Sequence, residues 1–274
     1  MIASVFLWTL LAAVARCCIS IVVDRGPWSS AKAQTYLFDF LFHASTTAAG
    51  LWAFFQLPHQ FTLTSLLDDR SGWWHYQEAV TEASSIAPFV FGTLRSIVHA
   101  NAGYYIFSFW LVSVTTARID MLSHHFVSAL MALIGAYSRA YLPAVVVVVA
   151  HNASDVFLLL GKLWQMRQTR TFRLLSDISF YAFLTCWMPT RLYFIPRYLA
   201  WPIVATNPIR LENPTFIVLV CVILVVQTLH CYWSFMILRL AYRKITHSGY
   251  TRTDDEDFVC SEKQGNICTQ PNEN

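Results

Sequence analysis

The chain has 274 residues, of which 56% are hydrophobic and only 13% are charged, and its formal net charge is +3. Soluble domains contain about 25% charged residues, so this composition indicates a membrane protein and argues against a soluble enzyme. The net charge is small and the basic residues are scattered along the chain, which argues against nucleic-acid binding.

Seven apolar segments are long enough to cross a bilayer as helices, which takes about 20 residues each. The first segment lacks a basic N-terminal region and a clear cleavage site, which favours a retained helix over a secretory signal. The sequence therefore predicts an all-α, polytopic membrane protein with about seven transmembrane helices. In chain order, the expected spans are residues 2–23, 36–57, 100–117, 119–138, 141–164, 175–199 and 215–240.

Short basic segments follow the fifth and the seventh spans, and such segments favour the cytosolic side of a membrane. We therefore expect a luminal N-terminus and a cytosolic C-terminus. Residues 1–35 are expected to form the first transmembrane helix and a cytosolic linker, and residues 247–274 a disordered acidic tail. The two basic segments contain Arg167, Arg170 and Arg173, and Arg239, Arg243 and Lys244.

The fourth and fifth spans carry ionisable groups, which cost about 2.5–3.5 kcal/mol each to insert into a bilayer. Asp120 and His124 share a helix face, and so do His151 and Asp155, because residues four apart are neighbours on a helix. The two spans are joined by a very short turn, so we expect a hairpin that brings imidazoles and carboxylates into one buried pocket. The groups concerned are Asp120, His124, His125, His151, Asn152 and Asp155.

These side chains suit acyl transfer to an amine. A neutral imidazole can take the proton that a protonated amine must lose before it attacks, and Asp155 can fix the imidazole tautomer and stabilise the imidazolium. Alternatively, His124 or His125 accepts the acyl group and forms a covalent intermediate that the amine then resolves. In a purely structural alternative, the polar groups only hold the helices together.

A metal centre is not expected. The pair His124 and His125 has no histidine two or three positions before it, so the histidine boxes of membrane di-iron enzymes are missing from this segment. The chain has no CxxC pair, and its other histidines are scattered.

Several ordered motifs resemble those of the TLC-domain family and, within it, the ceramide synthases. The family's acidic-Met-x-x-His-His is similar to Asp120-Met121-Leu122-Ser123-His124-His125, and its His-Asp-x-x-Asp is similar to His151-Asn152-Ala153-Ser154-Asp155. Further along, the family's Thr-Arg-Leu is similar to Thr190-Arg191-Leu192, and its Leu-Gln-x-x-Asn-Cys-Phe-Trp-Ser to Gln227-Thr228-Leu229-His230-Cys231-Tyr232-Trp233-Ser234. The likeness covers about residues 36–257, and Asn152 stands where the family usually has aspartate.

The resemblance implies a TLC domain over residues 36–246, with a helical bundle around an apolar acyl-chain cavity. It further implies transfer of a fatty acyl group from acyl-CoA to the amine of sphinganine or sphingosine in the endoplasmic reticulum membrane. Acyl-CoA is then a co-substrate, and no other cofactor is expected. The alternative is a non-catalytic TLC-domain protein that binds lipid or escorts cargo. The preferred base, the acyl-chain length and any homo- or hetero-oligomer are left open.

The resemblance also assigns roles to individual residues. In the family, the loop before the last span, here about residues 198–214, is tied to acyl-chain selection. The expected catalytic residues are His124, His125, His151 and Asp155; the expected substrate-binding residues are Asp120, Asn152, Arg191, Tyr137 and Trp233; and the candidates for binding CoA phosphates are Arg167, Arg170 and Arg173.

Overall fold

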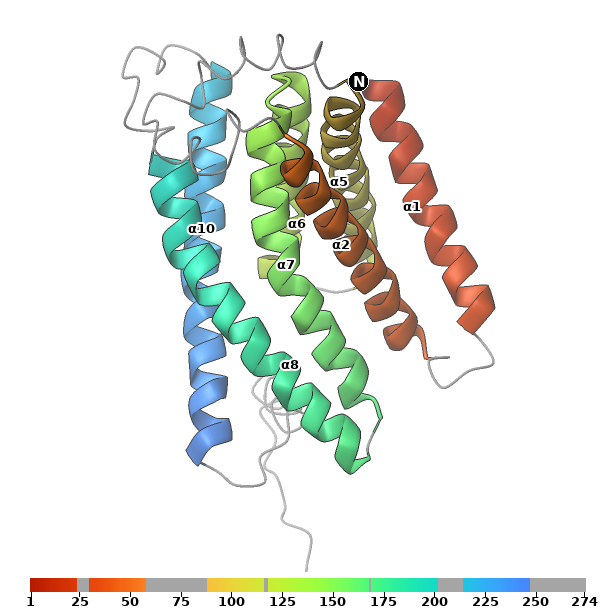
Figure 1. The fold of residues 1–274 in the computed structure, drawn as a ribbon, viewed down its shortest axis with the longest axis vertical. Coiled ribbons are helices and arrows are strands. Elements are labelled where there is room, and N and C mark those ends of the chain that lie inside the picture. Colours follow the sequence, from red (N-terminus) through yellow and green to blue (C-terminus); the bar gives the residue numbers. More distant parts are fainter. Residues whose placement is uncertain (24–29, 58–87, 116–117, 168, 202–213, 247–274) are drawn as a thin grey trace, which may run out of the picture. The chain divides into compact units, whose positions relative to one another are not determined.

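The computed structural model describes residues 1–23, 30–57, 88–115, 118–167, 169–201 and 214–246, and every regular element in these ranges is a helix. Figure 1 shows them. Each of the seven expected spans overlaps a helix, and the sixth is formed by two consecutive helices, α8 and η2. The third was expected to begin at residue 100, but α5 begins at Pro88. In chain order, the elements are α1 (Ile2–Val23), α2 (Ala31–Gln56), α5 (Pro88–Thr115), α6 (Ile119–Tyr137), α7 (Tyr141–Gln165), α8 (Arg170–Pro189), η2 (Thr190–Ala200) and α10 (Pro214–Thr246).

The prediction of an all-α polytopic membrane protein is confirmed. Within the described ranges, five helices are long and apolar enough to cross a membrane: α1, α5, α6, α7 and the part of α10 from Ile217 to Thr246. The expected acidic tail and most of the loop before the last span lie outside the described residues, so both expectations stay predictions.

The chain divides into two compact units, Met1–Cys231 and Tyr232–Asn274, with the boundary inside α10. In the first unit, α7 is the central helix, because it packs against α2 and α8 and also contacts α5, α6 and η2. Helix α5 in turn packs against α1, α2 and α6. The main apolar cluster lies where α2, α5, α7 and η2 meet, around Leu94, Leu142 and Val145, none of which is exposed.

Glycines permit two of the closest helix crossings. A Cβ at Gly103 on α5 would lie 2.7 Å from the backbone nitrogen of Thr9 on α1. A Cβ at Gly50 on α2 would collide with the side chain of Val149 on α7. Small residues let membrane helices approach closely enough to gain van der Waals contact, which is the main attraction between them in lipid.

Helices α6 and α7 are joined by a tight turn in which Arg139 has a φ of 56°, in the left-handed region. They approach closely near the turn, where a Cβ at Gly135 would lie 3.1 Å from Ala144. Along most of its length, however, α6 packs on α5 and makes only limited contact with α7. The expected hairpin therefore forms, but its two helices do not press face to face along the polar residues.

Helix α8 continues into η2, which has the wider i→i+5 hydrogen-bonding pattern of a π-helix. Pro189 and Pro196 lack the backbone N–H that a regular α-helical ladder needs, so the normal pattern is interrupted at both positions. Two side chains support the distorted backbone: the Thr190 hydroxyl donates to the Cys186 carbonyl at 2.7 Å, and the Gln227 amide donates to the Arg191 carbonyl at 3.1 Å. This irregular segment places Arg191 in the interior.

Candidate functional site

His151 on α7 is buried, with 6% of its surface exposed. Its ring atom Nδ1 lies 2.8 Å from the backbone carbonyl of Val147, one turn earlier on the same helix. A carbonyl oxygen only accepts, so Nδ1 carries the proton and Nε2 presents a lone pair. Nε2 is buried and has no hydrogen-bond partner in the part of the chain that the structure describes. Because burying a charged ring without an acceptor for its second N–H is costly, the neutral imidazole with a lone pair at Nε2 is favoured here.

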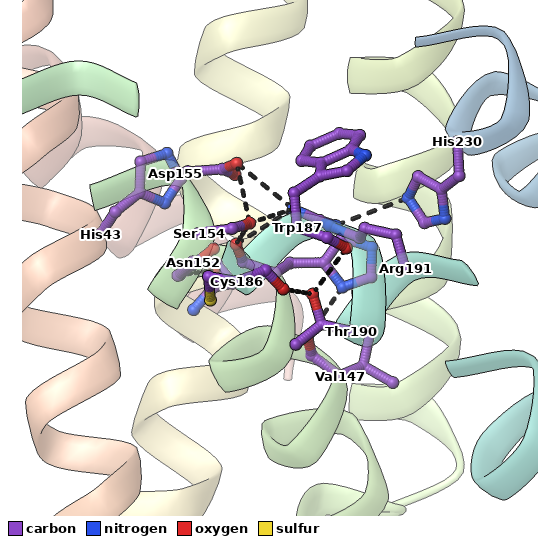
Figure 2. A network of polar contacts seen from close by, with 12 residues as sticks. His43, Val147, Asn152, Ser154, Asp155, Cys186, Trp187, Thr190, Arg191 and His230 are labelled. Atoms are coloured by element: carbon purple, nitrogen blue, oxygen red, sulfur yellow. Dashed lines mark hydrogen bonds and ion pairs between the residues drawn. The ribbon is translucent and has the colours of Figure 1, made fainter. Parts of the chain in front are cut away.

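Arg191 joins the polar groups of α7 to η2. Its side chain is 2% exposed, and its Nη2 donates to the His151 carbonyl at 3.0 Å, the Ser154 hydroxyl at 3.1 Å and Asp155 Oδ1 at 3.2 Å. Figure 2 shows these contacts around the guanidinium, with the ring of Trp187 beside it. The guanidinium carbon lies 4.5 Å from the centroid of that ring. This arrangement neutralises the buried arginine and holds the Asp155 carboxylate in one position.

The structure assigns the tautomer of His151 differently from the sequence analysis. We expected Asp155 to hydrogen-bond the imidazole, but its carboxylate contacts Arg191 and Ser154, and the Val147 carbonyl orients the ring. The reason is the helix register: a ring four residues before Asp155 can turn back to its own preceding turn, whose carbonyl is nearer.

His230 on α10 is a member of this site that the sequence analysis missed. It is fully buried, its ring centroid lies 5.1 Å from that of His151, and its Nε2 lies 3.5 Å from Arg191 Nη1. An arginine only donates, so His230 Nε2 accepts and Nδ1 carries the proton. His230 has no ionisable neighbour at helical spacing before it, so the available signal was its place in the Gln227–Ser234 segment that resembles a family motif.

His124 and His125 lie together on α6, with ring centroids 5.4 Å apart. The buried ring of Tyr105 on α5 contacts both, at 6.2 Å from His124 and 6.0 Å from His125. Tyr105 is close enough to Asp155 and Arg191 for an electrostatic interaction. His124 is likewise close enough to Arg191 and His230. The polar groups of α6 and α7 therefore interact electrostatically, although the two helices make little direct contact.

A second buried network, also missed by the sequence analysis, joins α2 to α5. The Tyr104 hydroxyl donates to Asp39 Oδ1 at 2.9 Å and lies 3.3 Å from His43 Nε2. A phenol has one hydrogen to donate, so the Tyr104 hydroxyl accepts from His43 Nε2. His43 is within electrostatic range of His125 and Arg191. The network thus lies near the same polar groups.

Asn152 is fully buried where α2, α5 and α7 meet. Its Nδ2 donates to the Thr46 hydroxyl at 2.8 Å and to Asn101 Oδ1 at 3.4 Å. These contacts give the amide a role in joining helices, next to the substrate-binding role expected from the resemblance, which stays a prediction.

The structure does not gather the other expected site residues around His151. Asp120 forms an ion pair with Arg118 at 2.7 Å, and Tyr137 is 72% exposed at the end of α6. Trp233 lies in the second compact unit. No cluster of three His, Cys, Asp or Glu side chains suited to a metal ion occurs within the described ranges. Of the three candidates for binding CoA phosphates, Arg170 and Arg173 are exposed, and Arg167 packs over the Phe172 ring at 5.6 Å.

Comparison with known proteins identifies relatives of the chain. It is 29% identical to ASC1-like protein 1 of Oryza sativa subsp. japonica over 63% of this chain and 57% of the relative. It is 26% identical to ceramide synthase LOH1 of Arabidopsis thaliana over 59% of this chain and 54% of the relative. It is 29% identical to ceramide synthase hyl-1 of Caenorhabditis elegans over 36% of this chain and 30% of the relative. The chain therefore spans little more than half the length of the first two relatives and less of the third. Residues 32–239 match the TLC domain, so the chain belongs to the TLC-domain family.

Proposed function

We propose that this protein is a ceramide synthase, which transfers a fatty acyl group from acyl-CoA to the amine of sphinganine or sphingosine. The observation that carries the proposal is the buried imidazole of His151, whose Nε2 is open beside the Arg191–Asp155 pair. Its relatives include proteins named ceramide synthases, which supports this chemistry. The residues match a reaction in which a protonated amine must lose a proton inside a membrane.

In the direct route, His151 Nε2 takes a proton from the ammonium group of the base. The freed amine attacks the thioester carbonyl carbon, so that a C–N bond forms and the C–S bond breaks. The amine nitrogen gives up a second proton, and the CoA thiolate takes one as it leaves. The balance is one amide, one CoA thiol and one released proton. Asp155, held by Arg191, compensates the positive charge that develops on the imidazole.

In the covalent route, an imidazole nitrogen of His124 or His125 attacks the thioester first. The acyl group is transferred to the ring and CoA leaves as the thiol, after which the amine displaces the imidazole. His125 Nδ1 is buried without a hydrogen-bond partner among the described residues, so a nucleophilic nitrogen is available on α6. Incubation with acyl-CoA alone distinguishes the routes, because only the covalent route adds the mass of an acyl group to the protein.

The proposal includes a location. The endoplasmic reticulum membrane supplies both lipid substrates, and a cytosolic C-terminus places the basic turn after α7 on the side where acyl-CoA is soluble. The exposed side chains of Arg170 and Arg173 are then available to CoA phosphates.

The test is turnover by the purified chain in nanodiscs with sphinganine and acyl-CoA. We expect release of CoA together with N-acyl product, and a loss of about 100- to 10,000-fold in the His151→Ala variant. The matched control is His99→Ala on α5, which removes a histidine that is also buried but bonds to Ser4 on α1. Equal rates in folded wild type and His151→Ala would refute the assigned role of His151.

One observation favours a second candidate function, a non-catalytic protein that binds lipid or escorts cargo. Asn152, at the position where the family usually has aspartate, uses its amide to join α2, α5 and α7 and carries no charge. Stoichiometric binding of sphinganine without any CoA release would establish this alternative.

A further inference from the structure

Two buried ring nitrogens near each other lack hydrogen-bond partners and have opposite character. His151 Nε2 is an acceptor, because the Val147 carbonyl fixes the proton on Nδ1. His230 Nδ1 is a donor, because the Arg191 guanidinium fixes Nε2 as the acceptor. The ring centroids are 5.1 Å apart with an interplanar angle of 44°, and the residues are 6% and 0% exposed.

Such a pair needs an explanation. An unsatisfied buried polar atom costs about 1–3 kcal/mol, and native proteins retain very few of them. The other contacts of the two rings do not satisfy these atoms. In each ring the second nitrogen is already bonded, His151 Nδ1 to the Val147 carbonyl and His230 Nε2 to the Arg191 guanidinium. A ligand that offers one donor and one acceptor a few ångströms apart would satisfy both atoms at once.

We propose that His230 is a substrate-binding residue that recognises a hydroxyl group next to the reacting amine of the sphingoid base. The amine donates to His151 Nε2, which takes its proton, while the hydroxyl oxygen accepts from His230 Nδ1–H. An amine and a hydroxyl on neighbouring carbons, with a hydrogen bond of about 2.9 Å at each end, span the required few ångströms. The inference rests on the proposed function and deepens it, because it names the chemical feature that separates a sphingoid base from a simple long-chain amine.

The position of His230 supports a donor role. In the motif that this chain resembles, the corresponding residue is asparagine, whose amide also donates. The side chain is held by the guanidinium of Arg191 and by the Trp187 ring, 5.9 Å away between centroids. Its donor is therefore oriented before any substrate arrives, which is the condition for a hydrogen bond that discriminates between substrates.

The experiment compares sphinganine with a primary alkylamine of the same chain length that lacks both hydroxyls. The measured quantity is the ratio of kcat/KM for the two substrates, with purified protein in nanodiscs. Wild type is expected to prefer sphinganine, and His230→Leu to reduce this preference about tenfold, the worth of one hydrogen bond. His230→Asn retains a donor and should keep the ratio within about threefold of wild type.

The matched control is His99→Leu, which makes the same change at another buried histidine and should leave the ratio unaltered. A loss of folding quality lowers kcat/KM for both substrates together and cancels in the ratio. If His230→Leu lowers both values by the same factor, His230 is only structural and the inference is wrong.

If wild type makes no N-acyl product from either substrate, the proposed function fails, and the inference is then judged on binding. Sphinganine should raise the Tm of wild type more than the alkylamine does, and His230→Leu should abolish that difference. Equal stabilisation of wild type by the two compounds would overturn the inference.

Discussion

Replacing Arg191 by leucine should destabilise the protein by about 3–5 kcal/mol, because it leaves the Asp155 carboxylate without its cation. The guanidinium donates to the His151 carbonyl, the Ser154 hydroxyl and Asp155 Oδ1. All three contacts are made by Nη2, which has two hydrogens, so they share these hydrogens and are not summed as three separate bonds. Asp155 keeps 20% side-chain exposure, so the lower end of the range is expected.

The free energy of unfolding can be measured by titration with denaturing detergent. A second variant, Arg191→Leu with Asp155→Leu, should recover at least about 1 kcal/mol, since no uncompensated carboxylate is left in the interior. The control Arg173→Leu removes an exposed arginine from the neighbouring helix α8 and should change stability by less than about 0.5 kcal/mol. A cost below about 1 kcal/mol for Arg191→Leu, with no recovery in the double variant, would contradict the account of a buried ion pair.

Three further changes test the packing around the site, each by the midpoint of thermal unfolding in nanodiscs. Gly103→Ala should cost about 1–3 kcal/mol, because its Cβ meets the backbone of α1, whereas Gly92→Ala on the same helix meets nothing within 4 Å and should not destabilise. Tyr104→Phe should cost about 1–3 kcal/mol by removing the donor to a buried carboxylate on α2, whereas Tyr137→Phe at a 72% exposed position should be neutral. Asn152→Ala should cost about 2–3 kcal/mol, since polar groups on α2 and α5 lose their donor, and an unchanged midpoint would show that the amide does not join these helices.

The transmembrane helices could be predicted from the sequence because their signal is local. A run of apolar residues long enough to cross a bilayer must satisfy its backbone within the segment, so run length alone indicates a helix. The expected span 2–23 coincides with α1, and the expected span 141–164 differs from α7 by one residue. The sixth span was harder, because Pro189 and Pro196 interrupt it and the resulting π-helical segment is supported by the side chains of Thr190, at its own start, and Gln227 on α10.

The partners within the candidate site could be predicted only in part. Groups on one helix, such as His151 and Asp155, are visible in the sequence because residues four apart share a helix face. Asp39 and His43 are four residues apart on α2, so their shared face was visible in the sequence, but the Tyr104 hydroxyl that joins them comes from α5 and was not. The approach of the His151 and His230 rings to 5.1 Å between centroids brings together residues far apart in the sequence, which no local pattern encodes.

The interior of this protein fixes the proton positions of three imidazoles, those of His43, His151 and His230. His151 is oriented by a carbonyl that can only accept, His230 by a guanidinium that can only donate, and His43 by a phenol whose hydrogen is already given to Asp39. In a region of low dielectric constant, where charge and dipole interactions are strong, such fixed partners make each ring either a donor or an acceptor at its remaining nitrogen. A reaction that moves a proton there then needs little reorganisation of its surroundings, which is the main way in which a preorganised site lowers a barrier. If the proposed function is correct, the unpaired nitrogens of His151 and His230 are the positions at which substrate and proton are handled, whereas the groups of Asn152 and Tyr104 mainly join helices.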